Sequence, residues 1–176
     1  ELESLLYLAL GGVFSELNEE AAPQFRFGYR FETDSAAFGI SGSLAPFPTT
    51  GGGGAGFDFE GLYFFDGQGA SSIYVGSALG YQGYSYGEPA FTNLDSTVGN
   101  DDGTWSGAGF AVRPMVGWEF FRATSGRLFV QAEANLPTYM MERGSEEEWN
   151  PSFMFTIGGG FDVDPAVFVL GTLLNK

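Results

Sequence analysis

The sequence predicts an all-β protein, an eight-stranded antiparallel up-and-down transmembrane β-barrel, and three observations lead to this prediction. Large apolar side chains alternate with small or polar ones in segment after segment, which is the period-two pattern of strands with two unlike faces. The connections between these segments are alternately long and short. One face of each segment is bulky and apolar, whereas the other is rich in glycine, serine and charged residues.

The composition excludes several classes of protein. The 176 residues suffice for one domain, and they include neither cysteine nor histidine. Disulfide, zinc–thiolate and histidine chemistry are therefore absent. A net charge of −15 with only 7 Lys+Arg argues against binding to nucleic acid, since that affinity comes from cationic contacts with phosphate. The longest apolar run, at 5–13, is too short for a membrane helix and is preceded by acidic residues. It makes a poor signal peptide, so we expect any export signal to have been removed already, with Glu1 near the mature start.

The eight predicted strands follow from the alternation taken in order along the chain. In the clearest of them, Phe25, Phe27, Tyr29 and Phe31 are interleaved with polar or small residues. Each predicted strand is long enough to cross the hydrocarbon at a tilt. The predicted strands are 4–15, 23–33, 37–46, 55–65, 72–86, 104–122, 127–141 and 151–163.

The lengths of the connections support a membrane barrel. Segments 34–36, 66–71 and 123–126 are short and rich in Asp, Gly and Ser, as tight turns are. Long loops at one end and tight turns at the other are typical of bacterial outer-membrane barrels. The long connections are 16–22, 47–54, 87–103 and 142–150.

The first predicted strand and the C-terminal tail are alternative candidates for one of the eight strands of the barrel. Both 4–15 and 166–174 are apolar on both faces. If the tail were counted as a strand instead of 4–15, and if both termini are periplasmic, the long loops and the short turns would lie on the wrong sides of the membrane. We therefore predict a barrel at 1–163 and a periplasmic tail or extra edge segment at 164–176.

The two faces of the strands predict which side meets lipid. Gly39, Ser41 and Ser43 occupy one face of their strand, and Phe38, Ile40 and Leu44 occupy the other. Eight strands enclose too little space for all the bulky side chains. The apolar face is therefore predicted to face lipid, and the face with small and polar residues is predicted to line the lumen. Aromatic residues near strand ends are predicted to form interfacial girdles: Tyr63, Phe65, Tyr81, Tyr84, Tyr86, Trp105, Trp118, Phe120, Phe121, Tyr139 and Trp149.

Two prolines interrupt the pattern. Pro114 and Pro137 lie inside predicted strands, where each removes a hydrogen-bond donor from the ladder. Bulges would accommodate them, and a bulge at Pro137 would change the facing of Tyr139. Alternatively, these two strands extend past the membrane and the prolines lie at its margin.

The predicted lumenal face gathers the charged residues. We expect them to pair across the lumen, with Arg30 and Arg113 bridging Glu60 and Glu133. A solid polar plug is one interpretation, and a gated, weakly cation-preferring conduit is the other, because acids outnumber bases in this set. We favour the plug, since side chains can just fill an eight-stranded interior. The predicted network is Arg26, Arg30, Glu32, Asp58, Glu60, Arg113, Glu119 and Glu133, with Gln131 and Asn135 on the same face.

No catalytic, cofactor or metal site is predicted. Asp58 and Glu60 could formally act as paired carboxylates, but their place among arginines favours a structural role. The long connections are acidic, and 95–103 lacks the ligand spacing of a calcium loop. A solvated, repulsive surface is the default interpretation, and divalent cations bridging to lipopolysaccharide phosphates are the alternative.

The last predicted strand carries the most specific resemblance. Thr156, Gly158, Phe161 and Val163 match the spacing of the β-signal read by the barrel-assembly machinery. With this strand, the chain resembles the small eight-stranded outer-membrane proteins of Gram-negative bacteria, of the OmpA-barrel, OmpX and OmpW kind. Such proteins often end on this strand, whereas about a dozen residues follow it here. The outer-membrane enzymes to which such barrels can be compared, a palmitoyltransferase, a lipid A deacylase, a phospholipase and an omptin protease, resemble one another in using a histidine, so the resemblance implies a protein that is not an enzyme.

The function expected from the sequence is structural or a surface interaction in the bacterial outer membrane, with periplasmic termini. Outer-membrane lipid or lipopolysaccharide is an expected partner, as is a larger envelope assembly docked through 164–176. The alternative is transport through a narrow pore, or along an OmpW-like path for small apolar molecules.

Overall fold

The computed structural model describes residues 3–17, 21–47, 52–86 and 104–163. In these ranges there is no helix that is both long and apolar enough to cross a bilayer. The predicted tail at 164–176 lies outside them, and so does the whole connection at 87–103.

Eight long antiparallel strands close into a barrel. The order of neighbouring strands runs from β5 through β4, β3, β2, β1, β10 and β7 to β6, and β6 also pairs with β5. This closure confirms the predicted fold class and leaves no free edge among these eight strands. The strands are β1 (Glu3–Ser15), β2 (Ala22–Glu32), β3 (Ala36–Pro46), β4 (Gly52–Phe64), β5 (Ser71–Tyr86), β6 (Trp105–Phe120), β7 (Gly126–Pro137) and β10 (Ser152–Asp162).

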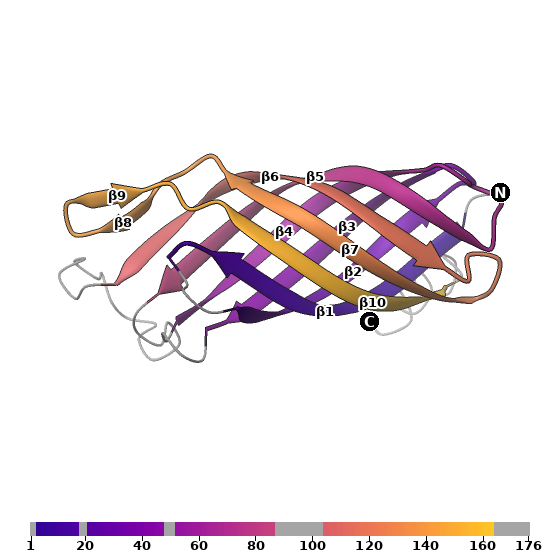
Figure 1. Cartoon of the computed structure of the whole chain (residues 1–176), viewed down its shortest axis with the longest axis horizontal. Helices are drawn as coiled ribbons and strands as arrows, with labels where there is room; N and C mark the ends of the chain where they lie inside the picture. The colour runs from indigo at the N-terminus through magenta and orange to yellow at the C-terminus, as the bar shows by residue number, and fades with distance from the viewer. Residues whose placement is uncertain (1–2, 18–20, 48–51, 87–103, 164–176) are drawn as a thin grey trace, which may run out of the picture.

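The two ends of the barrel differ. The turn end, on the right of Figure 1, carries the short connections 33–35, 65–70 and 121–125. It is also where β1 begins and β10 ends. At the loop end, on the left, β1, β3, β5 and β7 end and β2, β4, β6 and β10 begin. The predicted sorting of long and short connections is therefore confirmed by the strand bounds, which differ from the predicted ones by three residues or fewer except at the end of β7.

The end of β7 corrects the sequence-based prediction. The predicted strand 127–141 ends at Pro137, and the predicted loop 142–150 contains two further strands, β8 (Met141–Arg143) and β9 (Glu146–Glu148). They form a hairpin that projects beyond the loop end in Figure 1. Gly144 has a φ of 59°, as required at the first central position of a two-residue type II′ turn. In the sequence, the pair Gly144 and Ser145 between two short polar segments is the signal that could have predicted this hairpin.

Neither proline produces a bulge. Val112 pairs with Leu136 and Met115 with Glu133, so equal numbers of residues lie between the two pairs on each strand. The same register continues past Pro137, where Ser106 pairs with Glu142 of β8. Pro114 itself lies within β6, in register with Ser77. The chain therefore loses ladder hydrogen bonds at the prolines without inserting a residue.

The apolar face points outward, as predicted. Phe38, Phe59 and Phe153 are each more than 60% exposed, whereas Arg113 and Glu119 are almost fully buried. In water such a surface would be very unfavourable, whereas in a bilayer it meets acyl chains. The large exposed apolar residues therefore identify the lipid-facing side of the barrel.

Glycines on the inner face make room for large side chains on neighbouring strands. Gly28 pairs with Tyr7, and a Cβ at Gly28 would collide with the Tyr7 ring. Gly158 stands in the same relation to Phe129. The sequence predicted small inward residues but did not predict the large aromatic side chains that lie over them.

The outward face gives the first prediction. Ile40 is exposed in the middle of β3, and Ile40→Arg should lower the free energy of unfolding in lipid vesicles by about 2–4 kcal/mol. Ala108 is exposed near the loop end of β6, so Ala108→Arg should cost less than about 1 kcal/mol. Urea titration followed by tryptophan fluorescence measures both, and equal costs at the two positions would contradict the lipid-facing assignment.

Candidate functional site in the barrel lumen

A central ion-pair layer crosses the lumen and consists of Arg26, Glu133, Arg113 and Asp58. The guanidinium of Arg26 donates two hydrogen bonds to Glu133, at 2.6 and 2.8 Å. Arg113 pairs with Asp58, and its Nε lies 3.9 Å from the second oxygen of Glu133. All four side chains are buried. The layer joins β2, β4, β6 and β7, so it links opposite walls of the barrel.

A second group, the turn-side cluster, lies toward the turn end. Arg30 pairs with both Glu32 and Glu119. Arg127 also contacts these two carboxylates, as well as Glu3 at the start of β1. Arg127 further lies 3.3 Å from Asp162 at the end of β10. The cluster therefore ties both ends of the barrel chain to its interior.

Arg122 connects the three turns. It lies in the third turn and donates hydrogen bonds of 3.4 Å to the backbone carbonyls of Asp66 and Asp34, in the second and first turns. Its guanidinium lies 3.6 Å from the centre of the Phe64 ring, an arrangement that favours a cation–π interaction. Arg122 thus links the three turns on the lumenal side.

The eight predicted network residues all lie in the lumen, but two of their partners differ from the prediction. Arg113 approaches Glu133 as expected. Arg30, however, pairs with Glu32 and Glu119 and not with Glu60. Glu60 instead accepts a hydrogen bond of 2.9 Å from the Tyr7 hydroxyl. The tilt of the strands offsets facing positions, so alternation alone could not give the correct pairs across the lumen.

Two lumenal arginines were missed by the sequence-based prediction. Arg127 shares the inward face of β7 with Gln131 and Glu133, so extending the alternation by two pairs of residues from Gln131 would have found it. Arg122 follows the end of β6 in a turn, where alternation gives no information. With these two, the buried charges in the described ranges are five arginines and five carboxylates. The acidic excess that suggested a cation-preferring conduit is therefore absent from the buried set.

Some of the remaining inward polar groups also have partners near the middle of the barrel. Tyr74 donates a hydrogen bond of 2.6 Å to Gln131. Asp58 and Glu60 contact different partners, Arg113 and Tyr7, and do not form a paired carboxylate site. No group of three or more carboxylates in the described part of the chain is arranged to hold a metal ion.

A mouth cluster of apolar side chains fills the loop end of the lumen. Phe47 stacks on Tyr86 with ring centres 4.5 Å apart, and on Tyr84 at 6.1 Å. Burial raises the pKa of Tyr139, which packs against the cluster, to about 12, so its hydroxyl is neutral at physiological pH. The buried members are Val13, Ala22, Ala45, Phe47, Tyr86, Met141 and Met154.

The mouth cluster corrects part of the girdle prediction. Tyr84, Tyr86, Trp105 and Tyr139 were predicted at the membrane interfaces, but they belong to this cluster or pack against it. Phe120 is only partly exposed. The other predicted girdle residues are exposed: Tyr63, Phe65, Tyr81, Trp118, Phe121 and Trp149.

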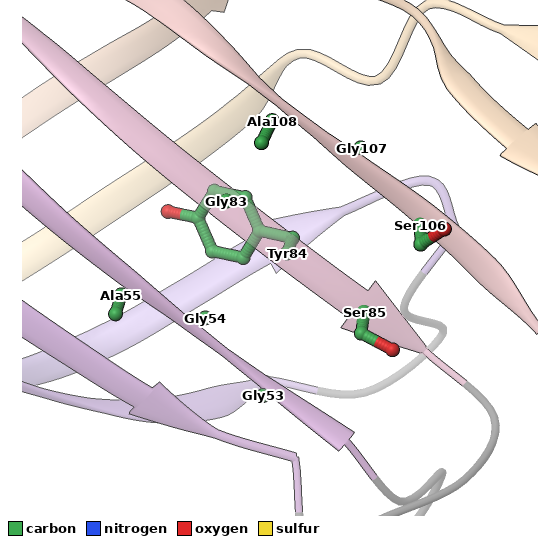
Figure 2. A pocket seen from close by; sticks show the side chains of 9 residues that line it. All are labelled: Gly53, Gly54, Ala55, Gly83, Tyr84, Ser85, Ser106, Gly107 and Ala108. Atoms are coloured by element: carbon green, nitrogen blue, oxygen red, sulfur yellow. The ribbon is translucent and has the colours of Figure 1, made fainter. Parts of the chain in front are cut away.

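An open hollow of about 470 Å³ lies beside Tyr84 at the loop ends of three neighbouring strands. Figure 2 shows the small residues that line it, with Ala55 on β4, Gly83 on β5 and Ala108 on β6. Tyr84 is the one large side chain of this lining. No charged group lines the hollow, so it does not provide a polar binding site.

The predicted β-signal residues lie at the end of the last strand. Thr156 is buried in the lumen, Gly158 faces inward, and Phe161 is exposed toward lipid. The backbone N–H of Val163 donates to the carbonyl of Ser4 at 2.9 Å, which extends the seam with β1. Of the acidic loop residues, those of 142–148 lie on the hairpin, whereas those of 87–103 lie outside the described ranges.

The central layer gives the second prediction. Arg26→Met removes both hydrogen bonds to Glu133 and leaves that buried carboxylate with the more distant Arg113 as its cationic partner. The free energy of unfolding should fall by about 3–5 kcal/mol. The double variant Arg26→Met with Glu133→Gln removes the unpaired charge and should recover more than half of the loss, measured by urea titration in the same vesicles. A double variant no more stable than the single one would contradict this account of the layer.

Comparison with solved structures places the fold among small outer-membrane barrels. Neisserial surface protein A superposes with a TM-score of 0.66 at 13% identity, covering 91% of this chain and 96% of that one. The N-terminal barrel of Pseudomonas aeruginosa OprF gives 0.52 at 14% identity, covering 93% and 100%. Ail, the attachment invasion locus protein of Yersinia pestis, gives 0.50 at 12% identity, covering 92% and 97%.

One further structure of Ail holds the heparin analogue sucrose octasulfate. No family model matches the sequence, and no curated relative matches it either. At these identities the structural likeness establishes the fold, which is that of a small outer-membrane β-barrel.

Proposed function

We propose that this protein is a closed outer-membrane barrel with a structural or surface-interaction role, and that its lumen does not conduct ions. The central ion-pair layer carries this proposal. Arg26, Glu133, Arg113 and Asp58 are buried and paired across the barrel. An ion entering the lumen would have to separate these pairs in a medium of low dielectric constant, which is strongly unfavourable.

The outward apolar surface and the shared fold support a location in the bacterial outer membrane. The sorting of the connections supports an orientation with the turn end, and hence both ends of the barrel chain, in the periplasm. In this orientation the β8–β9 hairpin faces the cell exterior.

The loop end is the surface that we propose for interaction. Glu142, Glu146, Glu147 and Glu148 lie on or beside the hairpin, and Arg143 is the one cation among them, pairing with Glu146 at 2.6 Å. The buried charges of the lumen balance, so they contribute nothing to the net charge of −15. A partner of this surface is therefore neutral or cationic. A polyanion such as the one held by Ail would be repelled.

Other parts of the proposal rest on the sequence. Thr156, Gly158, Phe161 and Val163 would be read by the barrel-assembly machinery during insertion. Lipopolysaccharide would surround the outer leaflet, with divalent cations between its phosphates and the acidic surface. Residues 164–176 would dock the barrel into a larger envelope assembly. With no histidine in the chain, we do not propose an enzymatic activity.

Conductance in planar lipid bilayers provides the test and the third prediction. The unmodified protein should show no discrete openings. A double variant, Arg26→Ala with Arg113→Ala, removes both cations of the central layer and should open a narrow, cation-selective path past Asp58 and Glu133.

The matched control is Arg143→Ala, which removes an exposed ion pair on the hairpin and should stay silent. Folding of each variant is checked by its shifted mobility on gels without heating. Unitary openings of the unmodified protein would overturn the proposal in favour of a narrow pore, and silence of the folded double variant would show that the layer is not the only barrier in the lumen.

A further inference from the structure

A pocket of about 170 Å³ opens at the turn end of the barrel, and all three turns contribute residues to its lining. In contrast to the hollow at the loop end, it is lined mainly by polar groups. A space of this size holds several water molecules or one small organic group. The charged and amide side chains of the lining are Glu3, Asp34, Gln68, Arg122 and Arg127.

Arg122 is a buried cation of this lining without a close acceptor. The residue is 8% exposed. Its two hydrogen bonds, to the carbonyls of Asp66 and Asp34, are both 3.4 Å long. Its Nε has no hydrogen-bond acceptor in the described ranges, where the nearest carboxylate oxygen, on Glu119, is 3.4 Å away. Hydrogen bonds from a guanidinium to a charged acceptor usually measure about 2.7–2.9 Å.

The other buried arginines differ from Arg122 in this respect. Arg26 donates to Glu133 at 2.6 and 2.8 Å. Arg30, Arg113 and Arg127 each contact a carboxylate at a shorter distance than any acceptor of Arg122. A guanidinium has five N–H donors, and donors that are buried without good acceptors are unfavourable. Arg122 therefore retains the capacity to bind an anionic group beside the pocket.

The carboxylates of the lining lie at the opening of the pocket. Glu3 and Asp34 are exposed, whereas Arg122 and Arg127 are buried. The carboxylate of Asp34 accepts a long hydrogen bond of 3.4 Å from Gln68, and Glu3 pairs with Arg127. The pocket thus has an incompletely satisfied cation in its wall and carboxylates at its edge.

The balance of charge at the turn end argues against a simple anion as the ligand. Three arginines there, Arg30, Arg122 and Arg127, are opposed by the four carboxylates of the turn-side cluster, and the exposed Asp34 adds a further negative charge. A free anion would be repelled by this excess. A simple cation would leave Arg122 unsatisfied, so a ligand that carries both charges fits best.

We propose that the turn-end pocket binds a small zwitterion, a molecule of amino acid size that carries one carboxylate and one ammonium group. The carboxylate accepts hydrogen bonds from Arg122, whose guanidinium is positioned by the Phe64 ring. The ammonium group lies at the opening, beside Asp34 and Glu3. This goes beyond a closed barrel with an interacting loop end, since it places a ligand site at the opposite end.

An NMR titration of the full chain with L-alanine tests the proposal, with the protein refolded in micelles of an uncharged maltoside. The amide resonances of Gln68, Gly69 and Ala123 and the Nε–H resonance of Arg122 should shift and saturate, while those of the mouth cluster stay unchanged. Acetate and methylamine carry one charge each and should bind at least about tenfold more weakly, because each loses a hydrogen bond between charged groups.

Two variants separate the roles of the two charges. Asp34→Asn keeps the backbone carbonyl that Arg122 contacts, and it should weaken L-alanine at least about fivefold without weakening acetate. Arg122→Met should abolish binding of both, and Asp34→Asn keeps the test valid if that variant does not fold. The matched control is Glu147→Gln, which neutralises an exposed carboxylate on the β8–β9 hairpin and should change nothing.

The absence of saturable shifts at the turn end would overturn the proposal. Equal affinities for acetate and L-alanine would also overturn it, since they would indicate a site for anions. Unchanged affinity for L-alanine in Asp34→Asn, or shifts at both ends of the barrel, would have the same consequence. These outcomes are independent of the conductance test, because the pocket lies outside the central layer and its binding does not depend on how the barrel is oriented in the membrane.

Discussion

The pairing of buried arginines with carboxylates is the constraint on which the rest of the lumen depends. Five of the six arginines in the chain lie inside the barrel. Each of the five pairs with at least one acidic side chain. The apolar exterior allows no charge in the middle of the strands, so every charged side chain there must point inward. An inward charge is tolerated only with a partner, and the strands must therefore bring partners together across the lumen.

The glycines of the inner face follow from the same constraint. Long side chains such as Arg26, Glu60 and Tyr7 can extend into the lumen only if the neighbouring strand carries no side chain in their path. Gly28 and Gly39 provide this space, since a Cβ at either position would collide with the Tyr7 ring or the Glu60 carboxylate. The frequency of glycine in the chain is thus related to the size of the side chains that fill the interior, and not to flexible loops alone.

The sequence predicted the strands and their facing but not the contacts across the lumen. Alternation fixes which residues point inward, because each strand is exposed to lipid on its other face, and Arg26 and Glu133 were placed correctly for this reason. Whether Arg30 meets Glu60 or Glu119 depends on the tilt and register of eight strands together, which no local pattern contains. Tyr84 and Tyr86 show a related limit, since an aromatic residue at a strand end can join an interfacial girdle or cover the lumen.

Polar groups of different kinds lie at different levels along the barrel axis. A uniformly charged interior would pack ion pairs at every level, and a uniformly apolar one would need no water. Here paired charges lie in the centre and at the turn end, while neutral amides with unpartnered atoms, such as Gln24 and Asn135, lie on the loop side of that centre. Neutral amides neither repel nor trap an ion pair, so they can border the layer without weakening it. The loop side of the lumen is therefore neutral, whereas its centre and its turn side hold the buried ion pairs.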